Sequence, residues 1–225
     1  MTSAGQGGGV AAGQRRSRPI VTALTPDARL SGAVRIEVDG EPFATVSAAA
    51  VAAEGIVPGG MLDEAARERL GSAADVEAAY RTALRALERR PFARADLGRR
   101  LQRKGHPREA VAAALERVVE LGLLDDAAFA VNYVETRAAR GRGPARLTRD
   151  LLAMGIERRL IDRALATNAA AEGVPAAVPL ALATRRAAQL GDLPRTVKRR
   201  RLLAFLARRG FAGREVGEMV KRVVG

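Results

Sequence analysis

The fold is decided by three short stretches that share one pattern, LGRRLQRKG at residues 97–105, LTRDLLAMG at residues 147–155 and LLAFLARRG at residues 202–210. Each stretch ends in glycine and has leucines eight and four residues before it. Apolar residues four apart lie on one face of a helix, and a glycine one turn later favours a left-handed helix end. Each stretch is therefore predicted to be a helix that ends at its glycine.

A second helix is predicted after each glycine, because apolar residues recur six and ten positions further on. These pairs are Val111 and Leu115, Ile161 and Leu165, and Val216 and Val220. Helical stretches are also expected upstream, at 75–88, 125–139 and 175–190, with Asp75 and Asp125 suited to helix starts. The sequence thus predicts a mainly α protein of three tandem three-helix repeats, an elongated architecture in which neighbours bury each other's apolar faces.

Residues 19–46 carry the only strand signals of the chain. Strands are predicted at 20–24, 34–38 and 43–46, with the turn dipeptide Asp39-Gly40 between the last two. A helix from Ser47 and a second one at 63–70 would complete a small α+β cap. The expected organisation is a disordered Gly-rich tail (1–18), the cap (19–73) and three repeats (74–122, 123–170 and 174–225), with linkers at 122–124 and 169–179.

Charge is divided unevenly along the chain, whose formal net charge is +13. Residues 1–73 hold seven basic and eight acidic residues, a net charge of −1, and residues 74–225 hold 31 basic and 17 acidic residues, a net charge of +14. Such asymmetry favours a polyanionic partner. Aromatic residues make up only 3%, which favours contact with a nucleic-acid backbone or a protein over base stacking.

The basic residues cluster on or beside the middle helix of each predicted repeat. If the repeats stack regularly, these clusters would form a stripe able to follow a phosphate backbone. The alternative is the ordinary solvated face of amphipathic helices. The predicted stripe contains Arg99, Arg100, Arg103, Lys104, Arg140, Arg142, Arg146, Arg149, Arg195, Lys198, Arg199, Arg200, Arg201, Arg208 and Arg209.

Catalytic signatures are not found, so no enzyme, cofactor or metal is predicted. The sequence holds no phosphate-binding loop, no nucleophile elbow and no cysteine, and its one histidine is His106. His106 follows the first repeat's glycine and is expected to pack partly buried. Asp125 and Asp126 are adjacent and so do not share a helix face, which favours helix capping over paired-carboxylate chemistry. Without a signal peptide or an apolar run of ~18 residues, we expect a cytoplasmic protein that does not bind membranes.

Several segments resemble the RecX family of regulatory proteins, over residues 78–224. Residues 83–87 through 96–105 resemble its first unit, and so do residues 121–126 followed by Phe129-Ala130. Residues 140–144 and 151–156 resemble its second unit, and residues 205–211 its third. Pro91-Phe92-Ala93 and His106 depart from the family's usual residues. The N-terminal hairpin resembles an extension found in some members.

The resemblance implies a curved monomer that binds the RecA recombinase filament on single- or double-stranded DNA. It further implies modulation, usually inhibition, of ATP hydrolysis and strand exchange, and so a role in homologous recombination, the SOS response and the regulation of DNA repair. Two alternatives stay open. A general sequence-independent nucleic-acid-binding protein would bind DNA without recombinase and with strong salt dependence, and a scaffold would depend on neither DNA nor recombinase.

Overall fold

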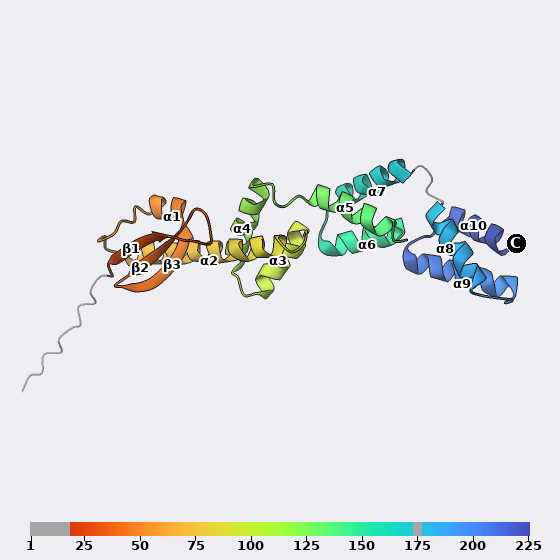
Figure 1. The fold of residues 1–225 in the computed structure, drawn as a ribbon, viewed down its shortest axis with the longest axis horizontal. Helices are drawn as coiled ribbons and strands as arrows, with labels where there is room; N and C mark the ends of the chain where they lie inside the picture. Colours follow the sequence, from red (N-terminus) through yellow and green to blue (C-terminus); the bar gives the residue numbers. More distant parts are fainter. Residues whose placement is uncertain (1–18, 173–176) are drawn as a thin grey trace, which may run out of the picture. The chain divides into compact units, whose positions relative to one another are not determined.

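The computed structural model describes residues 19–172 and 177–225. The chain separates into two compact units, residues 1–77 and residues 78–225. As predicted, the fold is mainly helical, with one small antiparallel sheet in the first unit (Figure 1).

The first unit contains the sheet and the short helix α1 (Ala48–Ala53). Its strands β1 (Val21–Pro26), β2 (Ala33–Val38) and β3 (Glu41–Ser47) pair in the order β1-β2-β3. The predicted turn is confirmed, since Asp39 (φ 52°) and Gly40 (φ 83°) both adopt the positive φ of a tight hairpin. One face of the sheet buries Ile36 and Val46 in the unit's apolar core.

A single helix, α2 (Glu64–Leu87), replaces the two helices predicted at 63–70 and 75–88. Asp63 starts it, because its carboxylate Oδ1 accepts a hydrogen bond from the Ala66 amide at 2.7 Å. Gly71 does not end the helix, since an interior glycine costs only about 1 kcal/mol. The prediction that Asp75 begins a helix was therefore wrong, because Asp75 lies in the interior of α2.

Over its described residues, 78–172 and 177–225, the second unit consists of the end of α2 followed by eight helices (Figure 1). They group into three three-helix repeats, which contain α2–α4, α5–α7 and α8–α10. The bounds are α3 (Arg94–Arg103), α4 (Arg108–Glu120), α5 (Asp126–Ala138), α6 (Pro144–Met154), α7 (Arg158–Glu172), α8 (Ala177–Ala188), α9 (Arg195–Arg209) and α10 (Arg214–Val224).

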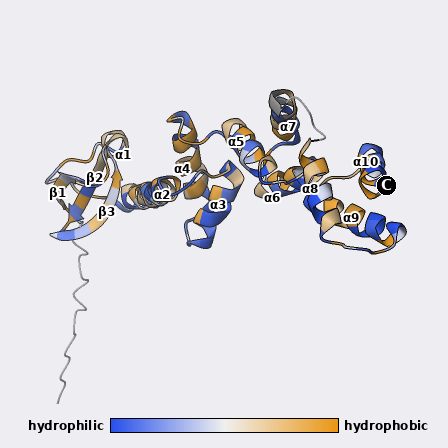
Figure 2. Ribbon diagram, turned by 45° about the vertical axis from the view of Figure 1, so that its right-hand side comes forward, coloured by the Kyte–Doolittle hydropathy of each residue, from blue (hydrophilic) through white to orange (hydrophobic). Residues whose placement is uncertain are grey.

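The leucine–glycine pattern has the structural meaning that the sequence predicted. The leucine pairs of α3, α6 and α9 are all buried, and each of these helices turns at a glycine with left-handed backbone. The φ angles are 91° at Gly105, 89° at Gly155 and 92° at Gly210. Asp125 caps α5 as predicted, with its Oδ1 accepting from the amides of residues 127 and 128. The apolar faces of the helices form the repeat cores (Figure 2).

The linker expected at 169–179 was placed too widely at both ends, because residues 169–172 belong to α7 and residues 177–179 to α8. Pro179 is buried in the first turn of α8. A proline fits there because amides in a helix's first turn have no intrahelical acceptor. Gly173, Pro175 and the predicted tail 1–18 lie outside the described residues, and the limits proposed for the individual domains stay predictions.

Candidate functional site

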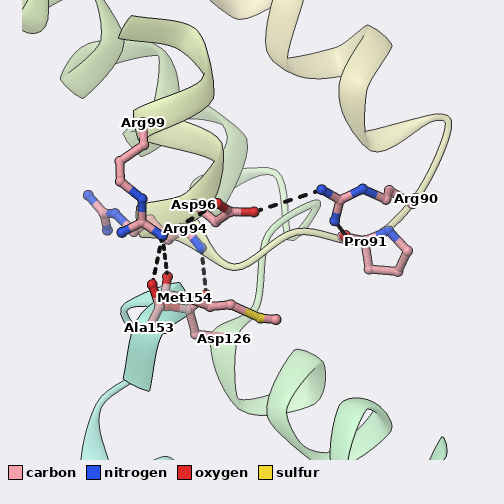
Figure 3. A network of polar contacts seen from close by, with 8 residues as sticks. All are labelled: Arg90, Pro91, Arg94, Asp96, Arg99, Asp126, Ala153 and Met154. Atoms are coloured by element: carbon pink, nitrogen blue, oxygen red, sulfur yellow. Dashed lines mark hydrogen bonds and ion pairs between the residues drawn. The ribbon is translucent and has the colours of Figure 1, made fainter. Parts of the chain in front are cut away.

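The first and second repeats are joined by Arg99 of α3, one of the predicted stripe residues (Figure 3). Its Nη2 donates to the carbonyl oxygens of Ala153 at 3.1 Å and Met154 at 3.2 Å. These residues end α6, where carbonyls lack helical partners and carry partial negative charge. Arg99 therefore stabilises the junction between the two repeats, and its guanidinium already has hydrogen-bond acceptors within the protein.

Two further contacts close this junction. The Arg94 amide, at the start of α3, donates to Oδ1 of Asp126 at 2.7 Å (Figure 3). Gly155 packs so tightly on α3 that a Cβ atom at this position would lie 2.5 Å from Cβ of Ala95. The glycine turn of the second repeat thus sits on the first turn of the first repeat's middle helix.

The second and third repeats meet in the same way. The Gly143 amide donates to the Arg209 carbonyl oxygen at 2.7 Å, and the Ala145 amide donates to the Gly210 carbonyl oxygen at 3.2 Å. A Cβ atom on Gly210 would lie 2.4 Å from the Arg146 amide nitrogen. Nη1 of Arg209 also donates to the carbonyl oxygen of residue 141 at 3.4 Å. In both junctions, the glycine turn of one repeat packs against the first turn of the middle helix in the repeat before it.

Arg142 and Arg146 are held by one carboxylate within the second repeat. Nη1 of Arg142 lies 2.7 Å from Oδ2 of Asp150, and Nε of Arg146 lies 2.9 Å from Oδ1. Tyr133 adds its hydroxyl to this network, 3.3 Å from Arg142. One negative charge therefore offsets part of the predicted cationic cluster of this repeat.

Most other members of the predicted stripe point to solvent. Arg100 and Lys198 are exceptions, since both are half-buried. Arg100 lies beside the Phe92 ring, and its Nε atom is buried without a partner. Within the described residues, no hydrogen bond or ion pair is made by the side chains of Arg103, Lys104, Arg140, Arg149, Arg195, Lys198, Arg199, Arg200, Arg201 and Arg208. Hydrophilic stretches of α3 and α9 are visible in Figure 2. Whether these cations act as one continuous stripe stays a prediction.

The N-terminal half of α9 holds the densest basic group, which we call the α9 cluster: Arg195, Lys198, Arg199, Arg200 and Arg201, all exposed except the half-buried Lys198. Arg195 and Arg199 also line a shallow pocket of about 240 Å³ together with Thr196 and Lys221. Sequence reasoning missed Thr196 and Lys221. The sequence signal that could have indicated Lys221 was the strongly amphipathic pattern of 214–224. This pattern predicts that Met219 and Val220 are buried, and Lys221, the next residue, lies beside α9 in the pocket.

His106 packs as expected, half-buried, with Nε2 3.0 Å from the Thr82 hydroxyl oxygen. Among the described residues, no three His, Cys, Asp or Glu side chains gather closely enough to hold a metal ion. No helix in the same residues is long and apolar enough to cross a membrane.

These features define a class of protein: tandem three-helix repeats, docked through glycine turns and bearing outward cations. Two models of RecX domains match the chain, the second three-helix domain at residues 125–165 and the first at residues 79–117. Regulatory protein RecX of Xanthomonas campestris is 33% identical over 156 residues, covering 69% of this chain and 94% of that protein. RecX of Pseudomonas entomophila is 34% identical over 145 residues, covering 64% and 90%. The chain belongs to the RecX family.

A shorter match agrees with this assignment, and two solved structures share the fold. Regulatory protein RecX of Pseudomonas syringae is 42% identical over 85 residues, and the match spans only 55% of its length. A crystal structure of regulatory protein RecX superposes with a TM-score of 0.76 over 91% of this chain and 99% of the other, at 24% identity. RecX from Lactobacillus salivarius gives 0.59 over 66% and 96%, at 19% identity. Similarity at these identities concerns the fold alone.

Proposed function

We propose that this chain binds the RecA nucleoprotein filament in the cytoplasm, as a monomer, and inhibits its ATPase and strand-exchange activities. It would thereby regulate homologous recombination and DNA repair without catalysing a reaction itself. Membership of a family whose relatives are named regulatory proteins supports a regulatory role. The partner is inferred from charge, because a filament presents both acidic protein and DNA phosphates to a basic surface.

The observation that carries the proposal is the α9 cluster. Its arginines Arg199, Arg200 and Arg201 are consecutive and exposed, and they make no hydrogen bond or ion pair with any described residue. Desolvating them without an anionic partner would be costly, whereas phosphate and carboxylate groups match the guanidinium fork. We therefore assign this cluster, with the other outward cations, to the filament contact.

The test is the DNA-dependent ATPase rate of the cognate RecA, titrated with this protein well below one molecule per recombinase protomer. We expect inhibition by the wild type and its loss when Arg199, Arg200 and Arg201 are all changed to Glu, with helical content unchanged by circular dichroism. The control for overall charge reverses three exposed α7 arginines, Arg158, Arg159 and Arg163, of which the first two also lose an ion pair. Inhibition that survives the α9 reversal, or that both triple variants abolish equally, would contradict the assignment.

A general nucleic-acid-binding function is the second candidate, favoured by the +14 charge of residues 74–225. It predicts tight, salt-dependent binding to DNA alone. It also predicts that ATPase inhibition disappears when excess DNA removes competition for sites. Inhibition that persists in excess DNA would favour the filament over free DNA as the target.

A further inference from the structure

The three middle helices differ at one set of equivalent positions. These positions lie 12 to 9 residues before the turn glycine, at 93–96 in α3 and 143–146 in α6, in the first helical turn and its cap. There Ala95 and Arg146 contact the glycine turn of the next repeat. Two of the four positions are small in each helix, alanines at 93 and 95 in α3 and Gly143 with Ala145 in α6, and one in each is an arginine. In α9, the same positions hold Lys198, Arg199, Arg200 and Arg201.

This difference changes what the third repeat can accept at that place. A glycine turn fits against Ala95 because the alanine side chain is a single methyl group, and at the other junction a turn packs on the backbone and Cβ of Arg146, whose guanidinium is paired with Asp150. In α9, four successive long cations without such an ion pair among the described residues would have to be desolvated under a turn. An anion, in contrast, would gain attraction from each cation. The equivalent surface of α9 is therefore suited to an anionic ligand instead of another helical repeat.

A pocket lies at this end of α9. Its volume is about 240 Å³, and it is lined by Arg195, Thr196, Arg199, Lys221 and residues 224–225. The lining thus offers two guanidinium groups, one ammonium group and one hydroxyl. The first turn of the 15-residue helix adds positive potential, because its N-cap Pro194 makes no side-chain hydrogen bond to the exposed amides.

One carboxylate competes for this charge. Nζ of Lys221 lies 2.6 Å from Oε1 of Glu218. The hydrogen bond from Lys221, with the positive charges of Lys221, Arg199 and Arg222, holds the pKa of Glu218 below its usual range. Arg195 and Arg199 make no ion pair with a described side chain, so the pocket keeps a surplus of positive charge even when the α-carboxylate of Gly225, which also lines it, is counted.

We propose that this pocket binds a single phosphate group. Guanidinium forks at Arg195 and Arg199 would each donate two hydrogen bonds to it, and Lys221 and the Thr196 hydroxyl would complete the contacts. A carboxylate would be satisfied by one guanidinium fork, whereas the several donors here fit the larger number of phosphate oxygens. The proposal names the ligand of one part of the surface assigned above, and in that sense it rests on the proposed function.

Binding is tested without recombinase, so that its outcome is separate from that of the filament assay. The full-length protein is titrated with inorganic phosphate, against chloride at equal ionic strength, and followed by amide chemical shifts of Thr196 and Lys221. Arg199→Ala should weaken phosphate binding about tenfold, the effect of losing a charged hydrogen-bond donor. The matched control, Arg200→Ala, removes the same charge one residue away, outside the pocket, and should change binding less than about twofold.

A gain-of-affinity variant guards against a simple folding defect. Glu218→Gln frees Lys221 and should tighten phosphate binding several-fold, whereas Glu215→Gln, with the same charge change on the same helix, should not. Equal effects of the two glutamine variants, or of the two alanine variants, would overturn the pocket in favour of diffuse electrostatics. So would shifts that sulfate, phosphate and chloride produce alike.

The source of the phosphate is distinguished by two oligonucleotides. Short single-stranded DNA with a 5′-hydroxyl offers only backbone diesters, and the same strand with a 5′-phosphate adds a terminal monoester. Equal affinity for both strands, lowered by Arg199→Ala, identifies a backbone phosphate as the ligand. A preference for the 5′-phosphate, lost in the same variant, identifies a terminal phosphate. Binding of both strands unaffected by Arg199→Ala and Arg195→Ala would refute the proposal, even if filament inhibition is intact.

Discussion

Replacing Gly155 with alanine tests whether the repeats depend on close contact at their glycine turns. Gly105 and Gly155 have nearly the same φ, 91° and 89°, so a left-handed penalty of about 1–2 kcal/mol applies to both. Among the described residues, a Cβ at Gly105 meets nothing within 4 Å, whereas one at Gly155 would lie 2.5 Å from Cβ of Ala95. Carbon atoms pack at about 3.5–4.0 Å, and relieving such an overlap costs about 1–3 kcal/mol.

Gly155→Ala should therefore lower the free energy of unfolding by about 2–5 kcal/mol, and Gly105→Ala by about 1–2 kcal/mol. Urea unfolding followed by circular dichroism measures both. Ala95→Gly, which alone costs about 1 kcal/mol, removes the overlap, since the next atom from the new Cβ is Nη1 of Arg99 at 3.6 Å. The double variant should recover about 1–3 kcal/mol relative to additivity. Equal losses at the two glycines, with no coupling to Ala95, would refute the reasoning.

Three further outcomes follow from local contacts. Arg99→Ala should lower the free energy of unfolding by about 1 kcal/mol through its lost carbonyl contacts and raise amide hydrogen exchange in α6, whereas Arg103→Ala on the same helix should do neither. Asp125→Ala should cost about 1 kcal/mol in urea unfolding and Asp125→Asn less, because asparagine also caps helices. The hydrogen bond from Arg69 lowers the pKa of Glu54, so its stabilisation exists above the unfolded pKa and is lost as pH falls through the folded one. Glu54→Gln should therefore make the melting temperature depend less on pH below about pH 4.5. The difference should be small because the pair is exposed.

The repeats could be predicted because their signals are local. A leucine pair four residues apart and a glycine one turn later specify a helix and its end within nine residues, and the structure confirms this at Gly105, Gly155 and Gly210. The interior of α2 was misjudged for the same reason. Gly71 and Asp75 carry local signals of a break, but the cap at Asp63 starts a helix that continues through both.

The junctions could not be predicted, because the residues in contact are far apart in sequence. Arg99 and Arg103 lie on the same helix and are chemically identical, yet only Arg99 meets the end of α6, some 54 residues away. The glycine at 155 already had a sufficient local explanation as a helix end, so nothing in the sequence signalled its contact with Ala95. The RecX resemblance identified the family but carried no information on which arginines face inward.

The division of the cations explains how one repeat pattern can serve both assembly and binding. Where a middle helix begins with small residues, as at Ala95 and Gly143, the next repeat's glycine turn approaches the backbone, and arginines such as Arg99 and Arg209 are used to hold it. Where the same positions carry Lys198–Arg201, that approach would desolvate four cations without compensation. The charge then remains available to an anion. The loss of the small residues at these positions thus removes, in physical terms, the surface that docks a repeat, and it leaves Arg199 available to the phosphate pocket proposed above.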